Sequence, residues 1–257
     1  MINPNRPILI SVAQYIDELE AGTVTIFDLI EKASQLGVAG LELRREMWPN
    51  RESELTVARE KIESLNLTVT YATQATLFNQ NIEGDTTLRQ DIDTAAALGS
   101  PVFRVFPGQV PDDNDEAGWA IGQGVVDYAA SQGVTLALEN YNWEPGNTLA
   151  EVKSVLDRIE SPHLGTNIDI GNYDNNGQDN LAAIQAIGHR AIYSHLKDRA
   201  TDDPSDLTYL GGGSLSMDEI VAALDALPQQ IYYCFEFRGG GEPDQRIEKS
   251  LAYLRQR

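Results

Sequence analysis

Eight short apolar runs alternate with eight amphipathic stretches along the chain, and no other feature constrains the fold as strongly. We expect strands at 8–13, 40–44, 67–73, 101–106, 134–140, 164–170, 191–196 and 230–237, with helices near 25–37, 52–65, 85–98, 115–131, 148–159, 178–188, 216–226 and 243–255. Strands that alternate with helices favour a parallel sheet with crossover helices, and eight such units close a barrel. We therefore predict a single (β/α)₈ TIM-barrel domain over residues 1–257.

Glycines and polar residues mark the ends of the predicted helices. Gly37, Gly99 and Gly133 each stand between a helical pattern and the next strand, where a left-handed residue commonly ends a helix. Four residues stand where helices are expected to begin and are predicted to cap them: Thr25, Asp85, Thr148 and Ser216. An open, doubly wound sheet is the alternative fold, but no glycine-rich dinucleotide loop follows the first or second strand.

Composition limits the classes of protein that the chain can represent. Apolar residues form 42% of the 257 residues, enough for a large core, and no apolar run reaches the ~18 residues of a membrane span. The single cysteine, Cys234, excludes an intrachain disulfide, and the N-terminal segment lacks a signal-peptide pattern, so we expect a cytoplasmic protein. The formal net charge of −20 argues against partners such as nucleic acid or an anionic membrane.

Four of the predicted strands end near a residue that can bind a metal ion. These residues are Glu139, Asp169, His195 and Glu236, on the fifth to the eighth strands. In a parallel barrel the carboxyl ends of the strands meet at one face, so the four side chains are expected to converge on its axis. Two glutamates, an aspartate and a neutral imidazole suit one divalent ion, for which we expect Mn²⁺, with Mg²⁺ or Co²⁺ as alternatives.

Each of these four residues also has a structural explanation when it is taken alone. Glu139 could cap a helix, and Asp169 could be a turn residue. His195 could be a hydrogen-bonded core histidine, and Glu236 could pair with Arg238. Burying four such groups at one end of four consecutive strands without a cation would be costly, which favours a shared site. The chain has only three histidines, too few for a histidine-rich multinuclear zinc site.

Short motifs around the four residues carry a resemblance to a known family. ALEN at 137–140, IDIGN at 168–172, SHLKD at 194–198 and FEF at 235–237 resemble the xylose-isomerase-like TIM-barrel superfamily of sugar isomerases and epimerases, over essentially the whole chain. In length and ligand type the chain is similar to single-metal ketose 3-epimerases, such as the tagatose and psicose epimerases, and to inosose-handling enzymes. The resemblance implies that the four residues hold the metal and that Glu139 and Glu236 are also the catalytic acid/base pair.

Two departures from the family pattern lie where a substrate would be contacted. Asn172 stands where epimerases of this group often carry a histidine, shortly after the sixth strand. Tyr141 follows the fifth strand, where many relatives have ENH instead of ENY. The identity of the sugar is therefore the least transferable part of the resemblance.

The expected reaction is proton transfer at the carbon beside a ketose carbonyl. A divalent ion that chelates the carbonyl oxygen and the adjacent hydroxyl acidifies the C–H bond between them. One glutamate removes that proton to give a cis-enediolate, and the other returns a proton from the opposite face, which inverts the carbon. The same groups would serve an aldose–ketose isomerase, or a lyase that expels a β-hydroxyl group from an inosose or keto-sugar.

Further residues near the expected mouth of the barrel are candidates for binding the sugar. Strand alternation gives three cations the orientation of a neighbouring inward residue: Lys197, Arg238 and Arg44. They indicate an anionic group on the substrate, unless each pairs with a nearby carboxylate, which we slightly favour. Arg104 could face in or out. Asn172 and three loop aromatics are the other candidates, the aromatics as an apolar wall over the sugar or as an oligomer contact: Trp48, Phe78 and Trp143.

Two other classes of function compete with a sugar epimerase or isomerase. Endonuclease IV shares the expected barrel, but the net charge and the scarcity of histidine argue against an AP endonuclease. A non-catalytic sugar-binding barrel would not require both Glu139 and Glu236. We therefore predict a metal-dependent enzyme whose partner is a small-molecule sugar, and leave a homodimer or homotetramer open.

Overall fold

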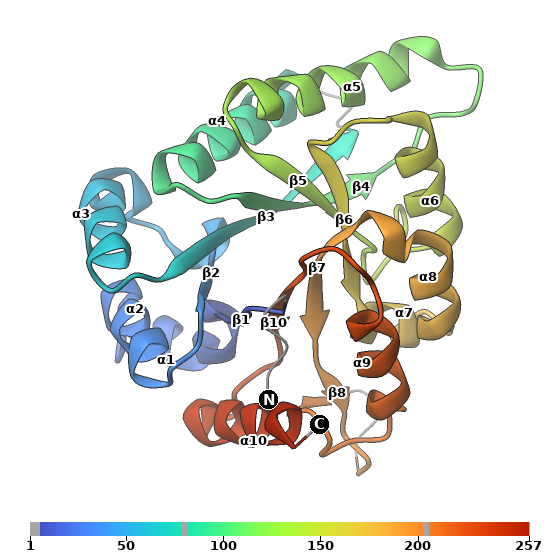
Figure 1. The fold of residues 1–257 in the computed structure, drawn as a ribbon. Helices are drawn as coiled ribbons and strands as arrows, with labels where there is room; N and C mark the ends of the chain where they lie inside the picture. Colours follow the sequence, from blue (N-terminus) through green and yellow to red (C-terminus); the bar gives the residue numbers. More distant parts are fainter. Residues whose placement is uncertain (1–5, 79–81, 203–205, 257) are drawn as a thin grey trace.

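The computed structural model of the protein describes residues 6–78, 82–202 and 206–256. Eight parallel strands close into a barrel in the order β1-β10-β7-β6-β5-β4-β3-β2, and helices surround it (Figure 1). The barrel strands are β1 (Ile8–Ser11), β2 (Gly40–Arg44), β3 (Thr68–Phe78), β4 (Val102–Gly108), β5 (Thr135–Glu139), β6 (Leu164–Asp169), β7 (Ala191–Leu196) and β10 (Tyr232–Phe235). The predicted (β/α)₈ barrel is confirmed.

Eight helices follow the barrel strands close to the predicted ranges. They are α2 (Ile26–Gln35), α3 (Arg51–Ser64), α4 (Ile82–Leu98), α5 (Glu116–Ser131), α6 (Leu149–Arg158), α8 (Asn180–Ile187), α9 (Met217–Asp225) and α10 (Pro243–Arg255). Short helical turns add η1 (Val12–Tyr15), α1 (Ile16–Glu20), η2 (Arg45–Met47), α7 (Ile170–Asn175) and η3 (Gly188–Arg190). The three predicted helix-ending glycines, Gly37, Gly99 and Gly133, have φ angles of 66°, 75° and 73°.

The predicted helix caps are partly confirmed. The hydroxyls of Thr25 and Thr148 accept hydrogen bonds from the third residue of α2 and of α6, and both helices begin with a complete capping box. Ser216 stands at the start of α9, but its side chain makes no capping hydrogen bond. The prediction for Asp85 is wrong, because α4 already begins at Ile82. Inside the helix Asp85 pairs with Arg89 one turn later, at 2.9 Å.

Among the elements that were not predicted are a short helix and a hairpin beyond the carboxyl ends of β6 and β7. Helix α7 begins directly after β6, and a two-stranded hairpin of β8 (Asp198–Arg199) and β9 (Leu207–Thr208) lies between β7 and α9. The carboxylate of Asp198 accepts hydrogen bonds at 3.0–3.1 Å from the backbone amides of Gly211, Gly213 and Leu215. Helix α7 and the hairpin are too short to show a hydrophobic period in the sequence. The hairpin also depends on the Asp198 carboxylate, whose partner amides lie 13 to 17 residues away.

The core has two parts, and their arrangement leaves the carboxyl end of the barrel free for polar groups. A large apolar cluster fills the space between the strands and the surrounding helices. A small second cluster lies apart from it and takes one residue from each of five strands: Leu9, Val102, Ala137, Tyr193 and Cys234. No helix in the described part of the chain is long and apolar enough to cross a membrane.

Candidate active site

Polar side chains replace the apolar ones towards the carboxyl ends of the strands. Strand register aligns Asp169 with His195, His195 with Cys234, and Ser11 with Glu42. Because side chains on a strand alternate, the residues two positions after the members of the small second cluster point into the barrel as those members do. Ser11 thus follows Leu9, and His195 follows Tyr193. The carboxyl half of the barrel interior is therefore built from ionisable groups.

The four predicted metal ligands converge. Nδ1 of His195 lies 3.0 Å from Glu139 Oε2, 3.4 Å from Asp169 Oδ2 and 3.9 Å from Glu236 Oε2. One ligand atom from each of Glu139, Asp169 and His195 can be chosen so that all three lie within 4.8 Å of one another. Glu236 is the outermost member: it follows β10, and its side chain is 17% exposed, whereas the other three are buried.

Three cations lie among the carboxylates and partly neutralise them. The Lys197 ammonium lies 2.7 Å from Asp169 Oδ2 and also hydrogen-bonds to Glu236. Arg44 Nη2 donates to Glu236 Oε1 at 2.7 Å. Arg104 faces inward, with its Nε 3.1 Å from Glu139 Oε2. Each cation therefore pairs with a carboxylate of the cluster. This is the arrangement that the sequence analysis favoured over an anionic group on the substrate.

The close packing of opposite charges shifts the pKa values. Burial alone would raise the pKa of Glu236, but the Lys197 ammonium and the Arg44 guanidinium outweigh it and hold that pKa well below its ordinary value. The pKa of Asp169 is also lowered, because Lys197 outweighs the effect of burial. For His195, burial is outweighed by the surrounding carboxylates, which raise its pKa. The cluster thus keeps the carboxylates of Asp169 and Glu236 ionised and attracts positive charge to the imidazole.

Amide side chains hold Glu139 in place. Asn167 Nδ2 donates to Glu139 Oε2 at 2.6 Å, and Asn172 Nδ2 donates to Oε1 at 3.1 Å. The carboxylate of Asp169 caps α7: its Oδ1 accepts a hydrogen bond from the backbone amide of Asn172 at 2.9 Å. Both oxygens of Glu139 are therefore oriented by neighbours before any ligand enters.

The donor set fits a divalent metal ion. Donor atoms bound about 2.1 Å from one ion lie roughly 3.0–4.2 Å from one another, which is the range found around His195. Nδ1 of His195 is completely buried and has no hydrogen-bond partner, although three carboxylates surround it. A cation between these groups would satisfy the imidazole nitrogen and replace the positive charge that the carboxylates attract.

The other predicted substrate-binding residues do not join the cluster. Arg238 is 63% exposed and pairs with Asp17 instead of a site carboxylate. Trp48 is 1% exposed within the outer core, and its indole nitrogen donates to Glu54. Trp143 is 64% exposed and meets the ring of Tyr141 edge-on.

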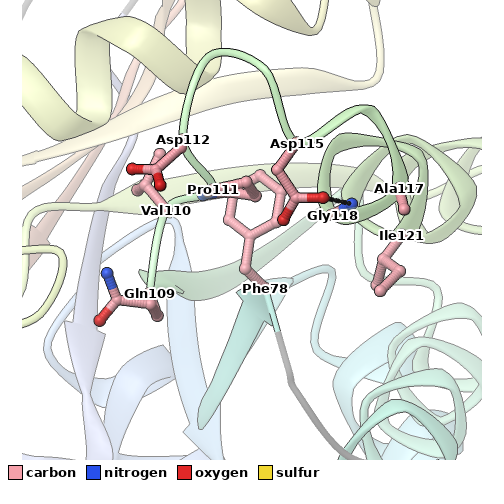
Figure 2. Close-up of a pocket in the computed structure, with 9 residues that line it drawn as sticks. All are labelled: Phe78, Gln109, Val110, Pro111, Asp112, Asp115, Ala117, Gly118 and Ile121. Carbon is pink, nitrogen blue, oxygen red and sulfur yellow. Dashed lines mark hydrogen bonds between the residues drawn. The ribbon is translucent and has the colours of Figure 1, made fainter.

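Phe78, at the end of β3, borders a separate cavity of about 470 Å³ beneath the segment that joins β4 to α5 (Figure 2). Its ring packs edge-to-face against Trp119. None of the nine residues that line this cavity belongs to the ionisable cluster. A cavity of about 70 Å³ adjoins the cluster through Asn172 and is also bordered by Asn142, Asn175 and Arg199.

Sequence reasoning missed the residues that support the predicted ligands. Glu42 lies inside the barrel, 2.8 Å from His195 Nε2, and Asn167 holds both Glu139 and the backbone amide of His195. Strand alternation is the signal that finds them, because Glu42 stands two residues before Arg44 and Asn167 two residues before Asp169. The same rule places Arg104 inside the barrel, two residues after Val102.

Comparisons with known proteins agree with this architecture. Residues 30–257 match the family described as "Xylose isomerase-like TIM barrel". An L-ribulose 3-epimerase from Methylomonas sp. (strain DH-1) is 27% identical over 186 residues, which span 67% of this chain and 62% of that protein. The D-psicose 3-epimerase of Clostridium cellulolyticum H10 superimposes with a TM-score of 0.79 at 15% identity, over 97% of this chain and 98% of the other.

A relative with a different described activity has the same fold. The probable 3-DHS dehydratase of Bacillus anthracis superimposes with a TM-score of 0.78 at 15% identity, over 98% of this chain and 99% of that one. At such low identity these superpositions establish the fold alone. The family match covers most of the chain, including all eight principal helices except the first few residues of α2, and all four converging residues. The chain therefore belongs to the xylose isomerase-like TIM-barrel family.

Proposed function

We propose that the protein is a divalent-metal-dependent sugar epimerase or isomerase that inverts a carbon beside the carbonyl of a ketose or related keto-sugar. One observation carries the proposal. Glu139 and Glu236 approach His195 and Asp169 from β5 and from the end of β10, and β6 and β7 lie between those two strands in the barrel. Two carboxylates on either side of one centre are what removal and return of a proton on opposite faces require.

The neighbours of the two glutamates give them different environments. Glu139 is fixed by Asn167 and Asn172, which suits a base whose direction of attack is set in advance. Glu236 hydrogen-bonds to Lys197, whose ammonium lowers the pKa of this carboxylate and keeps it ionised, ready to accept a proton. A bound Mn²⁺ would supply the Lewis acidity that polarises the sugar carbonyl and acidifies the adjacent C–H bond. The relatives that are named 3-epimerases support this reading, since a 3-epimerase inverts the carbon next to a 2-keto group.

The proposal is tested by product analysis with a panel of ketoses. Protein stripped with a chelator should be inactive, and Mn²⁺ should restore conversion of at least one ketose to its epimer. Glu139→Gln and Glu236→Gln should each lower kcat roughly 100- to 10,000-fold, because each removes a proton-transfer group. Glu63→Gln is the control, since that side chain is 61% exposed on α3. Full activity in either site variant would remove that residue from the mechanism.

A dehydratase would begin with the same proton abstraction and differ in the product. A product lighter by one water, formed from a keto-sugar or keto-acid in the same panel, would assign the protein to the lyases. Conversion that is unaffected by metal removal would contradict both versions.

A further inference from the structure

His195 stands between two groups of candidate metal ligands, and a single imidazole cannot serve both. Glu139 and Asp169 lie on its Nδ1 side; Glu42 lies on its Nε2 side and forms the second group together with Cys234. Both groups are buried, and each brings three ligand atoms within 4.8 Å of one another. A neutral imidazole carries its proton on one nitrogen and offers only the other to a metal. The contacts of Glu42 decide which nitrogen that is.

We infer that Glu42 is a positioning residue: it accepts the Nε2 proton of His195 and thereby directs Nδ1 to the metal, an inference that rests on the proposed function. Oε2 of Glu42 lies 2.8 Å from Nε2, and both side chains are completely buried. Nδ1 has no hydrogen-bond partner on the opposite side of the ring. A carboxylate that accepts from the second nitrogen of a ligating histidine fixes its tautomer and its orientation.

The rest of the surroundings of Glu42 make it an acceptor and not a metal ligand. Its other oxygen, Oε1, accepts hydrogen bonds from the hydroxyl of Ser11 and from Nε of Arg44, both at 2.9 Å. A metal bound by Glu42 would have to displace Arg44 or the imidazole proton. Cys234 belongs to the small second core cluster and is completely buried, so that side offers no room for a substrate.

Arg44 connects this support to the catalytic groups. Its guanidinium donates to Glu42 through Nε and to Glu236 through Nη2, at 2.9 Å and 2.7 Å. One cation thus orients the carboxylate behind the histidine and the outermost proposed ligand together. The predicted substrate-binding role of Arg44 is therefore replaced, in this inference, by a supporting role on the protein side of the site.

The inference is tested by metal affinity and not by turnover. Mn²⁺ binding to purified, metal-stripped protein is measured by titration calorimetry for wild type, Glu42→Gln, Ser11→Ala and Cys234→Ser. Glu42→Gln keeps the size of the side chain, but its amide group can donate to Nε2 and so leave the ring proton on Nδ1. Its affinity should fall about 10- to 100-fold. Ser11→Ala removes only a hydrogen bond to the other oxygen of Glu42, so its Mn²⁺ affinity should fall less. Cys234→Ser should stay within about twofold.

Two spectra identify the ligand atoms directly: one reports the imidazole nitrogen, and the other reports the thiolate of Cys234. With Zn²⁺ bound, histidine nitrogen NMR should show one imidazole that is metal-bound at Nδ1 and protonated at Nε2, in a chain that has only three histidines. With Co²⁺ bound, the absorption spectrum should lack a thiolate-to-cobalt charge-transfer band. Coordination through Nε2, a thiolate band, or unchanged affinity in Glu42→Gln would overturn the inference and leave the proposed function standing. Wild-type protein that binds no divalent metal would contradict both.

Discussion

The contacts of single residues in the site indicate their roles more closely than their positions in the sequence do. Lys197 was predicted to point at the site, and strand β7 does place it there, but its ammonium contacts the carboxylates of Asp169 and Glu236. Two partners already hold that ammonium, so a role in adjusting the pKa values of these carboxylates is better supported than a contact with the substrate. Asn172, at the position of a frequent family histidine, likewise binds Glu139.

Replacing Lys197 tests this distinction. Lys197→Met removes the donor beside Glu236, so kcat should fall by about 10-fold or more for every accepted substrate, with little selectivity among them. Steady-state kinetics on a series of ketoses measures this, with the exposed Lys249→Met of α10 as the control. A rise in KM that is confined to substrates bearing one particular group would instead mean that Lys197 contacts the sugar.

At the scale of elements, polar links fasten the helices to the barrel at sites away from the chemistry. Asp91 of α4 accepts a hydrogen bond from the Thr73 hydroxyl of β3 at 3.0 Å and lies 3.3 Å from Arg45. At the opposite end of the barrel, Arg6 precedes β1 and donates to the carbonyls of Leu224, Leu227 and Gln229 around the end of α9. Both links join segments that are far apart in the sequence.

Asp91 should make the stability depend on pH. Burial raises its pKa to about 6, against the ordinary 3.8, although Arg45 and Thr73 oppose the shift. The folded state therefore favours the protonated carboxyl, and the associated stability is complete below pH ~4 and is lost as the pH rises through about 6, by roughly 3 kcal/mol at most. Asp91→Asn cannot titrate, so its free energy of unfolding relative to wild type should improve between pH 4 and pH 7. A constant difference in denaturant unfolding would contradict this.

Arg6 should contribute to stability without affecting catalysis. Arg6→Met leaves several carbonyl groups at the end of α9 without their donor, which should lower the free energy of unfolding by about 2–4 kcal/mol. The control is Arg59→Met on α3, where a half-exposed ion pair with Glu63 contributes no more than about 0.5 kcal/mol. Equal losses in the two variants, measured by urea unfolding, would show that the hydrogen bonds of Arg6 to the end of α9 contribute no special stability.

At the scale of the whole molecule, the barrel was predictable because eight repeated units each carry a periodic pattern. Short elements without a period were missed: α7, and the β8–β9 hairpin that Asp198 organises through distant amides. The convergence of Glu139, Asp169, His195 and Glu236 followed from strand ends alone. Strand alternation could have placed Glu42 and Asn167 inside the barrel, but their contacts with His195 and Glu139 could not be predicted, because strand register sets them across the barrel.

Trp48 and Arg238 mark another limit of sequence reasoning. Trp48 and Arg238 follow the strands that should bring them to the site, yet one packs into the outer core and the other pairs with Asp17. Strand alternation predicts orientation only while the chain remains extended. Trp48 stands just after the helical turn η2, and Arg238 lies three residues beyond the end of β10. Past a strand end, local turns and the nearest opposite charge decide where a side chain lies.

The central claim is that Glu139 and Glu236 exchange a proton with a sugar carbon beside a carbonyl when a divalent metal is bound. The most direct measurement is NMR of a ketose panel incubated in D₂O with the Mn²⁺-loaded protein, after removal of the metal for detection. The account predicts that deuterium enters at the carbon next to the carbonyl with wild type, and that this exchange disappears in Glu139→Gln, in Glu236→Gln and after chelation. Absence of exchange with every ketose and keto-acid tested, despite stoichiometric metal binding, would contradict it.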